Sequence, residues 1–171
     1  MPDENVPDED VLGDDAIARY ARQIVVPGIG AAGQRKLLSS TVLLLGNGRG
    51  CDQARLYLRA AGVRVVRPVT PGGDENADVV VVADATALEE RMRRNLLERD
   101  TPICWYVVED DAFTAGVHPT APLPHSRIAS VVSPMAAGEA VHDAAACDAA
   151  SAACAILIGL PLRSGPIRFE I

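Results

Sequence analysis

Aromatic residues are scarce in this sequence of 171 residues, and closely spaced cysteine pairs are absent from it. Phe, Trp and Tyr make up 4% of the residues and hydrophobic residues 49%, so the core has to be built from Val, Leu, Ile and Ala. The four cysteines, Cys51, Cys104, Cys147 and Cys154, include no Cys-x-x-Cys pair. Their spacing argues against a zinc site and against a disulfide framework, so no metal site is expected.

An export signal is also lacking, because the N-terminus is acidic where a signal peptide needs a basic start and an apolar run. The most apolar late segment, residues 144–160, is interrupted by Asp148. This pattern is typical of a buried helix rather than a membrane span. We therefore expect a cytoplasmic protein that has no membrane segment.

Basic residues are absent from the first fifteen positions, which hold seven of the 23 acidic residues. These are Asp3, Glu4, Asp8, Glu9, Asp10, Asp14 and Asp15. The remaining 16 acidic residues equal the 16 Lys and Arg residues in number, so the rest of the chain is formally neutral. A neutral body argues against a nucleic-acid-binding surface, which needs a basic excess on one face. We expect residues 1–13 to form a disordered acidic tail, either a solvating leader or an interaction arm, and residues 14–171 to form one domain.

Apolar runs alternate with amphipathic segments along most of the chain. Helices are predicted over 16–24, 31–38, 51–61, 86–99 and 135–160, and strands over 41–45, 63–67, 78–83, 102–108, 113–118 and 167–171. The strands at 41–45 and 78–83 are almost wholly apolar, as central parallel strands covered on both faces should be. This order predicts an α/β fold: a Rossmann-like, open, mostly parallel sheet with helices on both faces and extra C-terminal strands.

Three motifs near the N-terminus carry a family resemblance. They are Arg19-Tyr20-Ala21-Arg22-Gln23-Ile24 followed by Pro27, then Gly33-Gln34-Arg35-Lys36-Leu37, then a strand that runs into Gly46-x-Gly48. Together they resemble the opening of the ThiF/MoeB/HesA superfamily, the ubiquitin-activating-enzyme-like adenylyltransferases. The resemblance is good over residues 15–66, fainter over 78–118, and limited to the type and order of elements over 135–171. It implies a fold that binds ATP and Mg and activates the C-terminal glycine of a small ubiquitin-like or sulfur-carrier protein.

The glycine loop departs from the family pattern Gly-x-Gly-Gly-x-Gly. Here it reads Gly46-Asn47-Gly48-Arg49-Gly50-Cys51. Glycine in the last place lets the helix approach its strand and leaves the helix N-terminus open to phosphate, whereas Cys51 adds a side chain there. Arg49 is either a phosphate-binding cation or an exposed loop residue, and Cys51 is either a packing residue or a reactive thiol. We interpret Gly46, Gly48, Arg49 and Gly50 as a vestigial nucleotide loop.

Other features that the resemblance calls for are missing. The second strand should end in an acidic residue that holds the ribose hydroxyls, but it ends in Arg67. The segment that should carry the triphosphate-binding Arg, Gln and Lys is absent, since only ten residues separate Arg67 from Asp78. Ala85 matches the metal-holding aspartate, with Asp84 one residue earlier, as either a vestigial cofactor residue or a helix N-cap. The histidines His118, His125 and His142 have no nucleophile partner by spacing.

These departures predict a shortened, degenerate member of the superfamily, with no cofactor and no reaction of its own. It is expected to act as a dimerisation or binding partner in a biosynthetic or protein-modification pathway. Two alternatives stay open. One is a minimal adenylyltransferase that uses ATP and Mg, and the other is an NAD(P)-binding protein in which Arg67 meets a 2′-phosphate.

The resemblance also assigns a role to the first helix. In the family, the arginine that matches Arg22 reaches across a dimer to the triphosphate in the neighbouring subunit. Arg22, with Arg19, is therefore a candidate trans-acting catalytic residue; the alternative is that both form ion pairs with Asp14 or Asp15. We expect a homodimer, or a heterodimer with an active ThiF/MoeB-like protein, and a ubiquitin-like or sulfur-carrier protein is a further candidate partner. No nucleic acid and no membrane are expected as partners.

Overall fold

The computed structural model describes residues 12–67, 76–83, 85, 88–109, 112–119, 139–161 and 166–170. The helices are α1 (Asp14–Ile24), α2 (Gly30–Ser39), α3 (Gly48–Ala60), α4 (Glu90–Leu97) and α5 (Glu139–Ile158). The strands are β1 (Thr41–Leu45), β2 (Arg64–Val66), β3 (Val79–Val82), β4 (Ile103–Glu109), β5 (Ala112–His118) and β6 (Ile167–Glu170). The elements therefore follow the predicted order.

The strands form one six-stranded sheet with the order β2-β1-β3-β4-β5-β6. Strand β1 pairs in parallel with β2 and with β3, and β3 pairs in parallel with β4. Strands β5 and β6 extend this core by antiparallel pairing. The predicted α/β class, the mostly parallel sheet and the extra C-terminal strands are thus confirmed.

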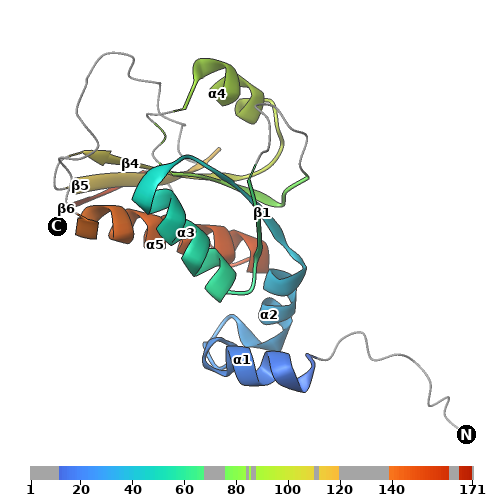
Figure 1. Cartoon of the computed structure of the whole chain (residues 1–171). Helices are drawn as coiled ribbons and strands as arrows, with labels where there is room; N and C mark the ends of the chain where they lie inside the picture. Colours follow the sequence, from blue (N-terminus) through green and yellow to red (C-terminus); the bar gives the residue numbers. More distant parts are fainter. Residues whose placement is uncertain are drawn as a thin grey trace, which may run out of the picture.

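Helices cover both faces of the sheet, as predicted. Figure 1 shows α3 and α5 on one face and α4 on the other. Successive residues of β1 point to opposite faces, so Val42 and Leu44 pack with α3 and α5 while Leu43 and Leu45 pack beneath α4. Both faces of β1 and β3 are covered by helices, so apolar side chains are favoured on both faces of these strands. This explains why their sequences are unbroken apolar runs.

Helix α5 lies against the middle of the sheet and against α3. It buries Val141 and a row of alanines: Ala145, Ala146, Ala149, Ala150 and Ala153. Among the described residues, α5 is the one helix with the length and mean hydropathy, 1.4, of a membrane span, and 33% of that window is buried inside the protein. The buried side of α5 agrees with the core helix that the sequence predicts.

Helix α1 packs on α2 and is hydrogen-bonded to the C-terminal end of α3. The side-chain amide of Gln23 donates a hydrogen bond to the carbonyl oxygen of Ala60 at 3.0 Å. Tyr20 is buried, and its ring lies against Gly62, whose φ of 95° needs glycine. These contacts fix α1 at the end of α3 that is remote from the glycine loop.

Most element boundaries lie within two residues of the predicted ones, and among the described residues two helix starts differ by more. Helix α3 begins at Gly48 rather than at Cys51, because the chain reverses within Gly46 and Asn47 alone. Helix α4 begins at Glu90 rather than at residue 86, and residues 86–87 lie outside the described part of the chain. As a result, Arg49 and Gly50 belong to the first turn of a helix and not to a loop.

The turn between β1 and α3 presses on the end of β3. Gly46 has a φ of 120°, and a Cβ there would overlap the carbonyl oxygen of Ala83. The amide of Ala83 donates to the carbonyl oxygen of Leu45 at 2.8 Å, so the two strand ends cannot separate without losing this bond. Gly48 also has a positive φ, 77°, but no atom lies within 4 Å of the position of its Cβ.

The three glycines Gly46, Gly48 and Gly13 therefore predict a graded loss of stability on substitution by Ala. Gly46→Ala combines backbone strain with overlap and should lower the free energy of unfolding by about 3 kcal/mol or more. Gly48→Ala carries the strain alone and should cost about 1 kcal/mol. Gly13, with an ordinary φ of -63° and open surroundings, is the matched control and should change stability by less than about 1 kcal/mol. Urea unfolding measures all three, and equal losses at Gly46 and Gly48 would contradict the role of Ala83.

Candidate functional site

The candidate site is the start of α3, where a nucleotide phosphate binds in doubly wound folds. Asn47 precedes the helix in an extended conformation, and its side chain caps no backbone amide. The N–H groups of the first turn, from Gly48 to Gly50, are therefore the local anion-binding groups. Which side chains surround them decides what this site can do.

Gly50 is the position where α3 comes closest to the sheet. A Cβ on Gly50 would overlap the hydroxyl of Tyr106 on β4 and would lie 3.6 Å from Nδ1 of His142 on α5. Tyr106 is buried, with 1% of its surface exposed. The glycine that permits close packing is thus Gly50, one residue before the place that the ungapped family comparison assigns to it. The close contact with Tyr106 explains why position 50 needs a glycine, and no bound phosphate is required for that explanation.

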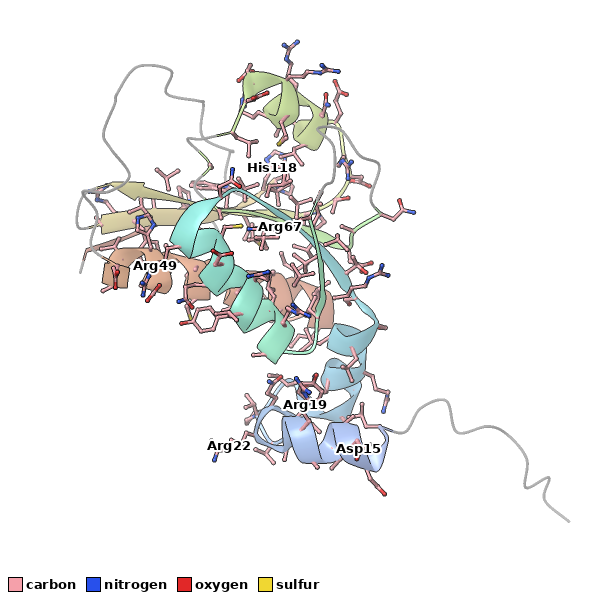
Figure 2. All side chains as sticks on the ribbon, viewed as in Figure 1. Asp15, Arg19, Arg22, Arg49, Arg67 and His118 are labelled. Atoms are coloured by element: carbon pink, nitrogen blue, oxygen red, sulfur yellow. The ribbon has the colours of Figure 1, made fainter. Side chains whose placement is uncertain are left out.

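Arg49 is engaged by the first turns of α5 (Figure 2). Its Nε and Nη2 donate to the two carboxylate oxygens of Asp143 at 3.1 and 3.0 Å. A third nitrogen, Nη1, lies 3.1 Å from Oε2 of Glu139. The hydrogen bond to Asp143 raises the pKa of Arg49, and the same bond lowers the pKa of Asp143. Neither sequence interpretation of Arg49 included this forked ion pair with α5.

Cys51 is fully buried, with 0% of its surface exposed, and belongs to the core between α3 and the sheet. Arg67, at the end of β2, donates from Nη2 to the sulfur of Cys51 at 2.8 Å and lies 3.7 Å from a carboxylate oxygen of Asp52. The hydrogen bond to Cys51 raises the pKa of Arg67. The burial supports the packing interpretation of Cys51, and Arg67 is folded back onto α3.

Two further thiols are also protected by the core. Burial raises the pKa of Cys104 to about 12 and that of Cys154 to about 11. Cys147 is exposed on α5. Among the residues that the structure describes, no three His, Cys, Asp or Glu side chains gather in a way that could hold a metal ion.

Arg19 and Arg22 lie on α1, away from the glycine loop (Figure 2). Both are exposed, and the guanidinium of Arg19 lies 5.7 Å from the centroid of the Tyr20 ring. Neither forms an ion pair with Asp14 or Asp15 within the described residues, so the surface-pair alternative is not what the structure contains. The length of α3, about 20 Å, separates them from the glycine loop of their own chain.

The remaining predicted site residues do not join this region. Asp84 and His125 lie outside the described residues. His118 ends β5 opposite Ile103, on the side of the sheet that α4 covers. The structure therefore brings Gly46, Gly48, Arg49 and Gly50 together at the start of α3, and it leaves Arg19 and Arg22 at the other end.

Sequence reasoning missed four neighbours of the glycine loop: Tyr106, His142, Glu139 and Asp143. They come from β4 and α5, more than fifty residues further along the chain. One sequence signal points to Glu139. An acidic residue in the first turn of a helix is favoured by the helix dipole, and it can also pair with a nearby cation. No one-dimensional pattern shows that Arg49 is that cation.

Part of the chain is similar to proteins described as adenylyltransferase and sulfurtransferase MOCS3. The protein of Sus scrofa is 44% identical over 64 residues, which are 37% of this chain and 14% of that protein. The protein of Drosophila willistoni is 51% identical over 53 residues, or 30% of this chain and 11% of that protein. The matches thus span about an eighth of the length of these relatives. No protein-family model matches the chain.

Solved structures share the whole fold at low identity. The crystal structure of PaaA has a TM-score of 0.68 and 13% identity, and the match covers 100% of this chain and 75% of that one. Escherichia coli MccB has a TM-score of 0.67 and 13% identity, with 97% of this chain and 69% of that chain covered. The sequence similarity to an adenylyltransferase and the shared fold confirm the predicted resemblance to the ThiF/MoeB/HesA superfamily, as a partial and shortened relative.

The contact between Gly50 and Tyr106 predicts a coupling that can be measured. Gly50→Ala should destabilise the protein although alanine favours helices, because its Cβ needs the space of the Tyr106 hydroxyl. In a Tyr106→Phe background, which removes that hydroxyl, the same substitution should cost less. We expect a coupling free energy of about 1 to 3 kcal/mol from a double-mutant cycle of unfolding measurements. Additive effects of the two substitutions would contradict the close approach.

Proposed function

We propose that this chain is a non-catalytic ThiF/MoeB-like subunit that pairs with an active adenylyltransferase and supplies Arg22, together with Arg19, to the nucleotide of its partner. One observation carries the proposal: both arginines are exposed, have no carboxylate partner among the described residues, and lie at the end of α3 remote from their own glycine loop. Cations placed in this way can serve a second molecule and not their own site.

The state of the chain's own loop supports the same proposal. Adenylation requires positioned cations around the phosphates. The two arginines next to the loop are both engaged within the protein, Arg49 by Asp143 and Glu139, and Arg67 by Cys51 and Asp52. An incoming triphosphate would have to displace these bonds before it met either guanidinium.

Arginine is suited to a role in trans. Its planar, permanently charged fork pairs with two phosphate oxygens at once, which a lysine cannot do. A pairing surface is at hand beside α1, where Ile17, Val25 and Val26 are exposed by 45%, 77% and 44%. Three exposed apolar side chains beside a helix whose arginines have no carboxylate partner in the described part of the chain are the features expected of an interface core with charged residues at its rim.

The comparisons support the class of partner. The MOCS3 relatives are adenylyltransferases by description, and MccB has been solved both with ATP and with MccA. A nucleotide and a second polypeptide therefore meet on this fold in a neighbour. We extend this to the present chain as a subunit of such an assembly, in a biosynthetic or protein-modification pathway.

A second candidate function is a minimal adenylyltransferase with its own nucleotide. It is favoured by the exposure of Gly48, the first residue of α3, where no atom lies within 4 Å of the Cβ position. Thermal unfolding with ATP and Mg separates the two candidates. A bound ligand at one hundred times its dissociation constant adds about 2.7 kcal/mol to the stability, whereas the non-catalytic subunit should show no shift. A shift with NADP that Arg67→Ala abolishes would instead identify the NAD(P)-binding alternative.

The role of Arg22 predicts a stimulation of nucleotide chemistry in a partner. Candidate adenylyltransferases from the same genome are mixed with this protein, and ATP–pyrophosphate exchange is followed. Arginines that act in trans contribute about 10³ to 10⁵ in rate in other phosphoryl-transfer systems, so at least a tenfold stimulation is expected from the native protein. Arg22→Ala should abolish most of it, and Arg22→Lys should restore little, because lysine lacks the forked geometry.

Arg94→Ala provides the matched control, since Arg94 is an exposed arginine on α4, on the opposite face of the sheet. Complex formation is followed in parallel by size-exclusion chromatography. Equal exchange with the native and Arg22→Ala proteins, in complexes that form equally well, would eliminate the arginine-donor role and leave a scaffold.

A further inference from the structure

The C-terminal end of α3 presents carbonyl groups that have no partner within the helix and need donors from elsewhere. Two of them are paired by the backbone that follows the helix. The amide of Gly62 donates to the carbonyl oxygen of Arg59 at 3.1 Å, and the amide of Val63 donates to that of Leu58 at 3.0 Å. The φ of 95° at Gly62 makes this turn possible. The next two carbonyl groups along the chain need donors from other elements.

Side chains of α1 and α2 supply these two donors. Nε2 of Gln23, on α1, donates to the carbonyl oxygen of Ala60 at 3.0 Å. Nε2 of Gln34, on α2, donates to the carbonyl oxygen of Ala61 at 2.9 Å. Two helices thus bind adjacent residues at the end of a third helix through the same kind of side chain. We call Gln23 and Gln34 the glutamine clamp.

Both helices also converge on the turn that follows α3. A Cβ on Gly62 would lie 3.0 Å from Cδ2 of Leu38, 3.1 Å from Nε2 of Gln34 and 3.1 Å from Cζ of Tyr20. Gln34 is completely buried, and within the described part of the chain its Oε1 has no hydrogen-bond partner. A buried amide oxygen without a partner costs stability, so the contribution of Gln34 comes from its N–H donor.

Helix α1 has little other attachment to the body. Within its own bounds it buries one side chain, that of Tyr20, whereas α2 buries three residues and also packs on α5. Figure 1 shows α1 and α2 at one end of the molecule, with α1 outermost. An element that buries few side chains opens at a lower free energy than the core. The two clamp bonds are therefore a large part of what holds α1 in place.

The clamp holds α1 without using its positive charges. Lysine and arginine side chains commonly pair the last carbonyl groups of a helix. Arg19 lies four residues before Gln23, so the two side chains leave the same side of α1. Arg19 nevertheless has no hydrogen-bond or ion-pair partner among the described residues. Because uncharged amides pair the carbonyl groups of α3, the guanidinium groups of α1 are left for other contacts.

We propose that Gln23 and Gln34 are positioning residues, and that α1 is a detachable unit which the glutamine clamp holds at the end of α3. When the clamp opens, α1 leaves the body together with Arg19 and Arg22 while the sheet stays folded. The closed clamp fixes where both arginines stand, which lowers the cost of ordering them in a complex. The use of α1 in a partner's site rests on the proposed function, whereas the clamp belongs to one chain in isolation.

Hydrogen exchange of backbone amides in the full chain tests the clamp without a partner. Gln23→Met keeps the approximate size and the helix propensity of the side chain but removes the donor. Loss of one hydrogen bond changes an opening equilibrium by about twofold to tenfold, so the amides of α1 should exchange faster by that factor. The amides of β3, in the core, should keep their native rates.

A rescue variant separates the hydrogen bond from the packing of the side chain. Gln23→Lys retains a donor, and a cation is favoured at the C-terminal end of α3, so α1 should exchange within about twofold of the native rate. Ala21→Met and Ala21→Lys make matched changes at an exposed position in the same turn of α1. They report the effect of each side chain on α1 itself, and the rates of the Gln23 variants are read relative to them.

Gln34→Glu tests the other half of the clamp, because it keeps the shape of the side chain and loses the donor. It should speed exchange in both α1 and α2, and by more than Gln23→Met does in α1, since its carboxylate is buried. If this variant does not fold, the Gln23 variants decide the question by themselves.

Native rates in Gln23→Met would overturn the proposal, because the bond to Ala60 would then not hold α1. Equal acceleration in α1 and β3 would also overturn it, because α1 would then open only with the whole fold. These measurements use the isolated chain, so their failure leaves the role of Arg22 to be judged by ATP–pyrophosphate exchange. A lack of stimulation in that assay would in turn leave the clamp unaffected.

Discussion

The buried hydroxyl of Tyr106 lies where any side chain on Gly50 would have to be, and this contact sets how closely α3 approaches the sheet. Because α3 is held there, its N-terminal amides stand beside α5, and Arg49 meets Asp143 and Glu139. The same close approach buries Cys51 completely and brings it within reach of Arg67 at the end of β2. The contact between Gly50 and Tyr106 therefore positions Arg49 and Cys51 beyond the carboxyl end of β1.

In this arrangement, groups that would contact a phosphate in a nucleotide site contact other groups of the protein. In a nucleotide site, the cations around a helix N-terminus point at phosphate and are left unpaired by the protein. Here each of the two nearby guanidinium groups has an acceptor from another element, and the space beside Gly50 is filled by the hydroxyl of Tyr106 rather than left for a ligand. The protein itself pairs the cations and fills the space that a phosphate would use. The loop can therefore be retained as a structural turn.

The fold could be predicted from the sequence because its signals are local. The unbroken apolar runs Thr41–Leu45 and Val79–Val82 require burial on both faces, and the glycines at 46 and 62 mark the turns. Of the site, the sequence indicates the glycine loop, Gly46, Gly48, Arg49 and Gly50, but not its contacts. Those contacts are tertiary: the hydroxyl of Tyr106 against Gly50, and the carboxylate of Asp143 on Arg49, come from elements far along the chain. The start of α3 at Gly48 was missed because glycine and arginine in its first turn resemble a loop.

Net charge conceals the electrostatics of this molecule. Residues 1–15 carry -7 and residues 16–67 carry +8, so the remaining residues must carry -8 for the total of -7. A sum near zero over residues 16–171 therefore describes two opposed halves and not an uncharged surface. Exposed charges act over about 8 to 10 Å at physiological ionic strength, so a partner senses the local excess and not the total. Within α1 the exposed carboxylates of Asp14 and Asp15 offset Arg19 and Arg22, so the basic excess of residues 16–67 comes from the elements that follow α1.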